Sequence, residues 1–130
     1  SYSTATYRQA NNSAANQLAF VRGLNEDAAS ASAGVLVTTS TTSNRSVFVA
    51  IGLDSATAFD AGCIPGWGSM YTGTPSVQNS ISTSYRGIPG LGYHFLAWLE
   101  RGGGGDTQTW YGDNGSPLIQ QSGIVGEVYA

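Results

Sequence analysis

Tyr93-His-Phe-Leu-Ala-Trp-Leu-Glu100 is the most apolar stretch of this 130-residue chain, and it decides the fold class. Its eight residues have the length of a β-strand, whereas a helix usually runs to ten residues or more. Arg101 and four consecutive glycines, Gly102 to Gly105, follow it. We expect Asp106 to Tyr111 to return across this glycine loop and pair with the stretch as a hairpin.

Three further segments have the composition of strands. Gly34 to Thr42 is rich in β-branched residues, and Ser46 to Leu53 has apolar side chains on both faces, which indicates a buried strand. Ser43 to Arg45 is expected to be the turn between them. Gly123 to Ala130 runs as an apolar strand to the carboxyl end, and we expect it to be paired inside a sheet.

The remaining segments are less regular. Ser1 to Thr6 is predicted to be a terminal strand, Leu18 to Leu24 is a short apolar run of β-formers, and Ala28 to Ala33 fits either a helical turn or a loose strand. Asp54 to Pro89 is rich in turn residues, with one exposed strand expected within Val77 to Tyr85. Seven to nine short strands and no convincing helix predict one domain over 1–130, an all-β antiparallel jelly-roll or β-sandwich.

The composition excludes several classes of partner. Charged residues make up 10% of the chain, so the surface is mostly neutral and polar. There is no lysine, and the five arginines are scattered singly, so no basic patch for nucleic acid is expected. A single cysteine rules out an intrachain disulfide. No apolar run approaches the roughly 20 residues that cross a bilayer, so we expect no membrane partner.

Loose aromatic and glycine patterns in the last third of the chain point to a family. The segments that carry them are Gly92-Tyr-His-Phe-Leu96 with Glu100, Thr109-Trp-Tyr-Gly112, and Ser122-Gly-Ile124 with Gly126. They resemble the C-terminal domains of tailed-phage virion proteins, which are similar in plan to the trimeric jelly-roll knobs of the complement C1q and tumour-necrosis-factor type.

The resemblance covers residues 85 to 130 best, and Phe20 to Asp54 only in outline. It implies a homotrimer in an extracellular virus particle, either decorating the capsid or forming the head of a tail fibre or spike that contacts the host. The implied partners are other copies of the chain, other virion proteins of the capsid or fibre shaft, and a host surface glycan. Burial of sheet edges and faces by oligomerisation agrees with this implication.

Four aromatic residues are the candidate ligand-binding residues: Trp67, Tyr71, Trp110 and Tyr111. They lie in or beside glycine-rich turns, where aromatic rings stack on sugars or anchor a partner protein. The alternative is that they fill the core or a subunit interface. The sequence leaves both readings open.

No combination of residues predicts chemistry. His94 is the only histidine and is expected to be packed or hydrogen-bonded, and Cys63 has no neighbour in sequence that would activate it. Asp106, Asp113 and Asn114 carry oxygen ligands for calcium, but the EF-hand spacing is absent. No Gly-x-Ser-x-Gly motif occurs. We therefore expect no catalytic residue, no metal and no cofactor.

Three hypotheses of function follow. The first is a non-enzymatic bacteriophage structural protein, a trimeric β module of the virion. The second is a carbohydrate-binding module or lectin that uses the loop aromatics. The third is a polysaccharide-degrading fragment, because two catalytic carboxylates need only converge in space.

Overall fold

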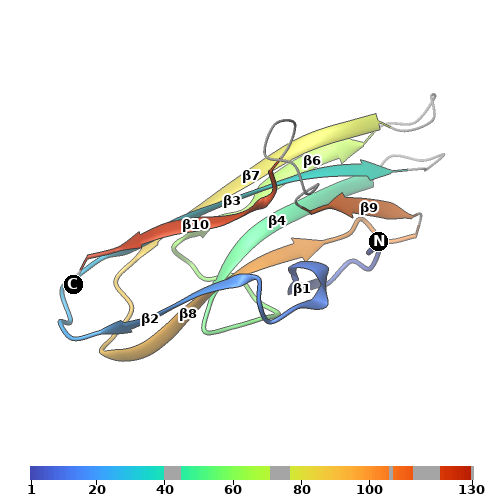
Figure 1. The fold of residues 1–130 in the computed structure, drawn as a ribbon. Helices are drawn as coiled ribbons and strands as arrows, with labels where there is room; N and C mark the ends of the chain where they lie inside the picture. Colours follow the sequence, from blue (N-terminus) through green and yellow to red (C-terminus); the bar gives the residue numbers. More distant parts are fainter. Residues whose placement is uncertain (40–44, 71–76, 106, 113–120, 130) are drawn as a thin grey trace.

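The computed structural model describes residues 1–39, 45–70, 77–105, 107–112 and 121–129, which form two packed antiparallel sheets (Figure 1). Sheet A contains β1 (Tyr7–Gln9), β2 (Gln17–Arg22), β8 (Gly92–Arg101), β4 (Arg45–Leu53) and β6 (Gly66–Met70). Sheet B contains β10 (Gly123–Val128), β9 (Gln108–Tyr111), β3 (Ala29–Thr39), β7 (Val77–Gly87) and β5 (Cys63–Ile64). In the described residues, the only helix is the three-residue 3-10 turn η1 (Ala10–Asn12). The predicted all-β antiparallel sandwich is confirmed.

The strand pairs are nested around β5. β2 pairs with β8, β3 with β7, and β4 with β6, so an early strand always pairs with a late one. This nesting is the pairing scheme of a jelly roll. The structure describes ten strands where seven to nine were expected, because one edge of each sheet is built from two short strands: β1 and β2 on β8, and β9 and β10 on β3.

The core lies between the sheets. Sheet B contributes mainly alanines and valines from β3, and sheet A contributes larger side chains from β4 and β8. The fully or nearly fully buried apolar residues include Ala29, Ala31, Ala33, Val35, Val37, Val47, Val49, Ile51, Ile81, Tyr85, Leu96 and Trp98. Ala50 and Leu99 lie on the outer side of sheet A but are buried too, because the loop after β4 folds over them. This loop is so close that a side chain at the neighbouring Gly52 would meet the carbonyl groups of Ser55 and Ala58.

The predicted hairpin between β8 and residues 106–111 is wrong. β8 is already paired along both sides, with β1 and β2 on one side and with β4 on the other. The glycine segment therefore carries the chain across to sheet B, with Gly104 and Gly105 at positive φ, and β9 pairs with the end of β3. Gln108 and Thr39 lie opposite each other where β9 begins.

Three other expectations are also corrected. β10 is an edge strand that pairs with β3 alone, so it does not lie inside the sheet. β7 lies between β3 and β5 and buries Ile81 and Tyr85, so it is only half exposed. The first strand begins at Tyr7, after the segment Ser1 to Thr6.

The remaining expectations are resolved in part. Ala28 to Ala33, left open between helix and strand, falls mostly in β3, which begins at Ala29. Most of the expected turn at Ser43 to Arg45 lies outside the described residues. The described part of the chain contains no helix long and apolar enough to cross a membrane.

Candidate functional site

A groove opens between the two sheets where both edges are interrupted at the same level. β8 pairs with β2 up to Ala97 and with β1 from Leu99, which leaves Trp98 between them. β3 pairs with β10 up to Gly34 and with β9 from Leu36, which leaves Val35 between them. Trp98 and Val35 both line the groove, whose volume is about 380 Å³. The breaks in strand pairing therefore open the interior to solvent.

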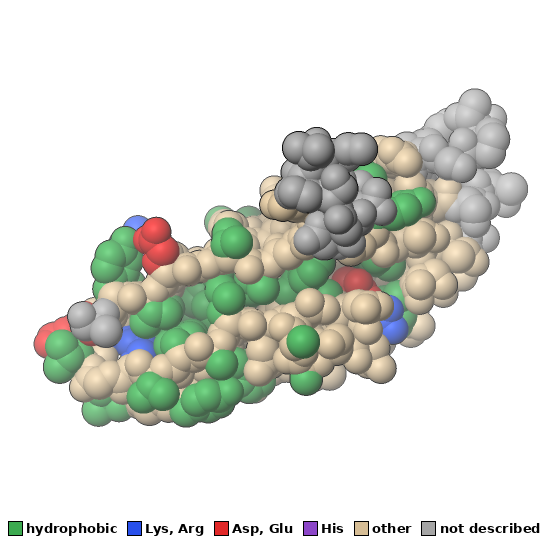
Figure 2. All heavy atoms as spheres, viewed as in Figure 1, with side chains coloured by type: hydrophobic (Ala, Val, Ile, Leu, Met, Phe, Trp, Pro, Cys, Tyr) green, Lys and Arg blue, Asp and Glu red, His purple; other side chains and the backbone are tan. Residues whose placement is uncertain are grey.

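The groove is visible from the side of these edges. Figure 2 shows a hollow between the edge that contains β10 and the edge that contains β2, with apolar side chains inside it and charged side chains toward β1. The described residues that line it from sheet A and its turn include Arg8, Asn11, Asn16, Trp98 and Glu100, and from sheet B Trp110, Tyr111 and Ser122.

The floor of the groove holds an ion pair whose carboxylate is buried and whose arginine is partly exposed. Glu100 is 2% exposed because it follows Leu96 and Trp98 on the inner side of β8. Nε and Nη2 of Arg8 both donate to Oε1 of Glu100, at 2.7 and 2.6 Å. Arg8 also lies over the ring of Tyr2, 3.8 Å from its centroid. The two charges compensate each other within the groove.

Burial raises the pKa of Glu100, and Arg8 lowers it by a smaller amount. A hydrogen bond from the backbone N–H of Asn11 also lowers this pKa. Asn11 and Asn12 both have positive φ, 53° and 52°, in the turn between β1 and β2. Asparagine adopts this conformation more readily than most residues, so this turn keeps the N–H directed at the carboxylate.

Two polar groups in the groove have no hydrogen-bond partner among the described residues: Nε1 of Trp98 and Oγ of Ser122. The backbone N–H of Trp98 is satisfied, because it donates to the carbonyl of Asn16 at 3.1 Å. The indole of Trp110 differs, since its Nε1 donates to the carbonyl of Tyr2 at 2.9 Å. Buried polar groups are rarely left unpaired, and these two atoms have almost no surface exposed to solvent.

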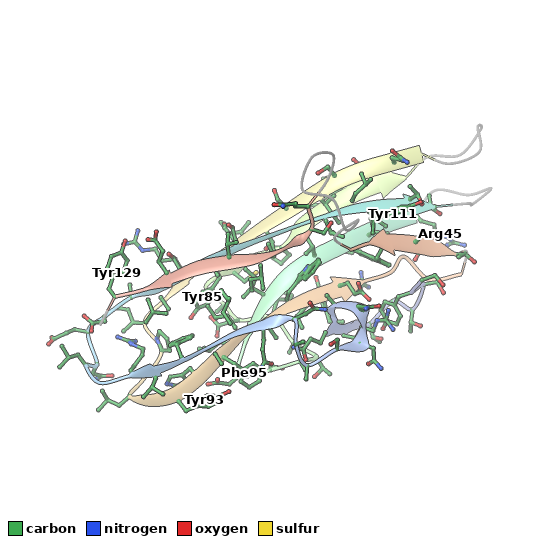
Figure 3. All side chains as sticks on the ribbon, viewed as in Figure 1. Arg45, Tyr85, Tyr93, Phe95, Tyr111 and Tyr129 are labelled. Atoms are coloured by element: carbon green, nitrogen blue, oxygen red, sulfur yellow. The ribbon has the colours of Figure 1, made fainter. Side chains whose placement is uncertain are left out.

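Two of the four predicted ligand-binding residues border the groove. Trp110 and Tyr111 follow each other on β9, so their side chains lie on opposite faces of sheet B: Trp110 is opposite the buried Val37, and Tyr111, 40% exposed (labelled in Figure 3), is opposite Leu36. Trp67 does not join them: it lies on β6, opposite Phe48, on the outer side of sheet A. Tyr71 lies outside the described residues.

Sequence reasoning missed Arg8, Trp98 and Glu100 as groove residues. The sequence does indicate that Glu100 points inward, because alternate residues of a strand share a face and Glu100 follows Leu96 and Trp98 in this alternation. A carboxylate on the apolar face of a buried strand requires a partner. The sequence did not identify Arg8 as that partner, since 92 residues separate the two.

His94 and Cys63 have structural contacts. Nδ1 of His94 lies 2.7 Å from Oδ2 of Asp54, and Nε2 lies 2.9 Å from the carbonyl of Gly90, so His94 is hydrogen-bonded as predicted. Cys63 is buried, with its sulfur 3.2 Å from the backbone N of Ile51. In the part of the chain that the structure describes, no three His, Cys, Asp or Glu residues are grouped as metal ligands.

Titration of His94 tests this local geometry directly. The hydrogen bond to Asp54 raises the pKa of His94 above 6.5. The stabilisation that this hydrogen bond gives the fold is therefore complete below about pH 6.5. It is lost as the pH rises through the pKa of His94 in the folded protein. Because the chain has one histidine, proton NMR follows a single imidazole. We expect a pKa above 6.5 that falls toward this value in Asp54→Asn; an unchanged pKa in this variant would contradict the assignment.

No protein-family model, no curated protein and no solved structure matches this chain.

Proposed function

We propose that this chain is a non-enzymatic structural module of a tailed-phage virion, which assembles as a homotrimer through the outer face of sheet A. The module would decorate the capsid or form the head of a fibre or spike. The resemblance in the last third of the sequence and the nested jelly-roll pairing support this proposal. The observation that carries it is the difference between the two outer faces of the sandwich.

The part of the outer face of sheet A that the loop after β4 leaves uncovered is apolar and aromatic. Val21 and Tyr93 lie opposite each other on β2 and β8, and both are more than 60% exposed. Tyr93 and Phe95 extend from the side of β8 that faces away from sheet B (Figure 3). Trp67, 67% exposed, lies further along the same face. Large exposed apolar patches on soluble proteins usually mark an interaction site.

The charges on this face are few. Arg101 lies on it, with its guanidinium 4.8 Å from the ring centroid of Phe48 and 6.0 Å from that of Tyr7. Tyr7 in turn packs edge-on against Phe59. Enrichment in aromatic residues and arginine with few other charges is the composition of an interface core. A second copy of the chain is the partner that this face fits best.

The outer face of sheet B has a different composition. Ser30 and Ser32 on β3 lie opposite Arg86 and Ser84 on β7, and the exposed apolar side chains Val125 and Ile64 lie on either side of them. A serine-rich face stays hydrated at little cost. We therefore assign the subunit contact to sheet A and the solvent-facing side to sheet B.

The groove supports the non-enzymatic part of the proposal. Glu100 is the only carboxylate among the described residues that line it, and Arg8 holds that carboxylate in an ion pair. Hydrolysis of a glycoside in the usual way needs two carboxyl groups, one on each side of the bond. The residues of the groove favour binding over cleavage.

The test is the solution mass of the chain by light scattering over a dilution series. We expect a concentration-independent mass of about three times 13.5 kDa. Val21→Asp should dissociate the trimer, because it places a charge in the proposed contact. Val125→Asp is the matched control, since Val125 is equally exposed, 68% against 70%, on an edge strand of the other sheet.

Three results would count against the proposal. A wild-type monomer would exclude the homotrimer. A dimer would exclude a three-fold assembly. A trimer that survives Val21→Asp and dissociates with Val125→Asp would move the contact to sheet B. A confirmed trimer would direct the next binding experiments to purified capsids and host cell surfaces.

A further inference from the structure

We propose that His94 is a pH-dependent latch: its doubly protonated ring fastens the β7–β8 loop, residues 88–91, across one end of the sandwich, and its neutral ring releases the loop. Figure 1 shows this loop passing from sheet B to sheet A at the end of the molecule away from the N-terminus. All parts of the latch belong to one chain. It therefore works in the same way in a monomer and in a trimer.

The loop is held at two successive carbonyl groups by side chains of sheet A. Arg22, the last residue of β2 and only 3% exposed, donates from Nη1 to the carbonyl of Pro89. Nε2 of His94, near the start of β8, lies 2.9 Å from the carbonyl of Gly90. One of these two side chains is a permanent cation, and the other titrates near neutral pH.

Apolar packing gives the loop little support. The side chains of Ile88 and Leu91 are 64% and 62% exposed, and only Pro89 between them is buried. Segments with few buried apolar contacts open at a low cost in free energy. The two hydrogen bonds to the carbonyl groups therefore contribute a large share of the local stability of the loop.

Both ring nitrogens of His94 face groups that accept hydrogen bonds. Nδ1 lies 2.7 Å from Oδ2 of Asp54, and Nε2 faces the carbonyl of Gly90. Both contacts are hydrogen bonds only when both nitrogens carry a proton, as in the imidazolium ion. The bond to Asp54 raises the pKa of His94 most, burial lowers it by less, and the carbonyl groups of Gly90 and Leu91 raise it further. The closed latch is therefore the low-pH state.

Asp54 decides which bond the neutral ring keeps. Oδ1 of Asp54 accepts from the backbone N–H of Phe95 at 2.9 Å, and the backbone N–H of Asp54 donates to the carbonyl of Phe95 at 2.9 Å. These bonds fix the carboxylate beside Nδ1 of His94. A hydrogen bond to a carboxylate is stronger than one to a neutral carbonyl, so the remaining proton stays on Nδ1. Nε2 then presents a lone pair to the carbonyl of Gly90, and the loop loses this bond.

The neighbouring charged and titratable groups do not replace His94 as the sensor. Arg22 on β2 keeps its charge at every pH. Burial of Tyr85 on β7 raises the pKa of its phenol above the ordinary value of 10, so the phenol stays uncharged at neutral pH. Asp54 and Asp60, in the loop after β4, supply negative charge at this end of the core. His94 has the ordinary pKa closest to neutrality among these groups.

The experiment is an NMR titration of the full chain, labelled with nitrogen-15, from about pH 5.5 to about pH 8.5. Above the pKa of His94, the ring nitrogen shifts should show the proton on Nδ1. The heteronuclear NOE of the Gly90 and Leu91 amides should fall with the same midpoint as the His94 titration. Gly23 and Leu24 are the internal control, because Arg22 holds the Leu24 carbonyl at 2.9 Å and does not titrate.

Two variants separate the latch from a general effect of pH. His94→Phe removes both hydrogen bonds but keeps an aromatic ring beside Phe20, whose ring centroid lies 6.0 Å from that of His94. Its loop should be mobile at both ends of the titration. In Asp54→Asn, the amide oxygen can keep the bond to Phe95, and the amide N–H donates to Nδ1. The neutral ring then carries its proton on Nε2, so this loop should stay ordered at both ends.

The outcomes decide the question whether or not every variant folds. A neutral wild-type ring with its proton on Nε2 would overturn the latch, because the bond to Gly90 would survive. A loop that keeps the same order throughout the titration would overturn it too, as would an equal loss of order at Gly23 and Leu24. Release of the loop at high pH in Asp54→Asn would contradict the role of Asp54. If His94→Phe does not unfold cooperatively on heating, the wild-type titration and Asp54→Asn supply the answer.

Discussion

Gly66→Ala is expected to destabilise the fold by about 3 kcal/mol or more, at the upper end of what overpacking costs. The chain crosses from β5 in sheet B to β6 in sheet A at Pro65, so β6 begins close to β7. A Cβ atom on Gly66 would overlap the backbone carbonyl of Ser82 and lie 3.1 Å from Cγ1 of Val49. A backbone group cannot move aside as a flexible side chain would.

The neighbouring contacts show how closely this side of the sandwich is packed. Asn79 on β7 donates from Nδ2 to the carbonyl of Ser69 on β6, at 3.2 Å, and Oγ1 of Thr83 donates to the carbonyl of Ile64 at 2.7 Å. Gly68 is confined as well, because its Cβ would lie 2.9 Å from Cγ2 of Ile81. A larger residue at position 66 would have to separate β6 from β7 and break the bond between Asn79 and Ser69.

Urea denaturation measures the effect as a lower midpoint with an unchanged slope. Gly123→Ala is the matched control, because Gly123 also lies in a strand and an added Cβ there meets nothing within 4 Å. We expect the control to change the free energy of unfolding by less than about 0.5 kcal/mol. Equal effects of the two substitutions would show that the close approach of β6 to β7 is wrong.

The sequence was sufficient for the fold class because local patterns carry that information. In β4, Val47, Val49 and Ile51 alternate with smaller or outward-facing residues, and the strand is found over Arg45–Leu53. The stretch around Leu96 has both the apolar content and the length of a strand, and β8 spans Gly92–Arg101. Alternation and strand length are properties of neighbouring residues, so they can be read without knowing what the strand pairs with.

Pairing partners could not be predicted in the same way. β9 has a strand-like sequence and follows a glycine loop, which favours a hairpin, yet it pairs with β3 because β8 has no free edge. β10 is apolar, yet it is an edge strand because β9 and β10 share one side of β3. Which edges are free is a property of the whole sheet, and no local pattern records it.

The candidate site was predictable only in part for the same reason. Trp110 and Tyr111 were identified from their type and their glycine-rich surroundings, and both border the groove. The groove itself exists because two edges, distant in sequence, are interrupted beside Trp98 and Val35. Trp67 has the same local signature as Trp110 but lies on another face, so sequence type alone could not separate the two residues.

Arg8→Met is expected to cost about 3–5 kcal/mol near neutral pH, because it leaves the carboxylate of Glu100 buried without its cation. Both Nε and Nη2 of Arg8 bond to that carboxylate, which is 2% exposed. The control is Arg86→Met, which removes an exposed arginine from the outer face of β7 and should change the free energy of unfolding by less than about 0.5 kcal/mol.

The loss in Arg8→Met should be smaller in acid. The pKa of Glu100 in the folded protein is already raised above its ordinary value of 4.5, so the folded state binds this proton more tightly than the unfolded chain does. The contribution of Glu100 to stability therefore falls as the pH rises from about 4.5 through the folded-state pKa. Removing Arg8 raises the pKa of Glu100 further. The variant therefore loses more unfolding free energy at neutral pH than at about pH 4.5, where Glu100 is largely protonated in the folded state.

Urea denaturation of the wild type and Arg8→Met at both pH values measures this difference. A double variant, Arg8→Met with Glu100→Leu, should recover most of the loss at neutral pH, because replacing both partners of a buried ion pair by apolar residues is often neutral or stabilising. The same loss at both pH values, or no recovery in the double variant, would show that Arg8 acts by packing on Tyr2 rather than by compensating the charge of Glu100.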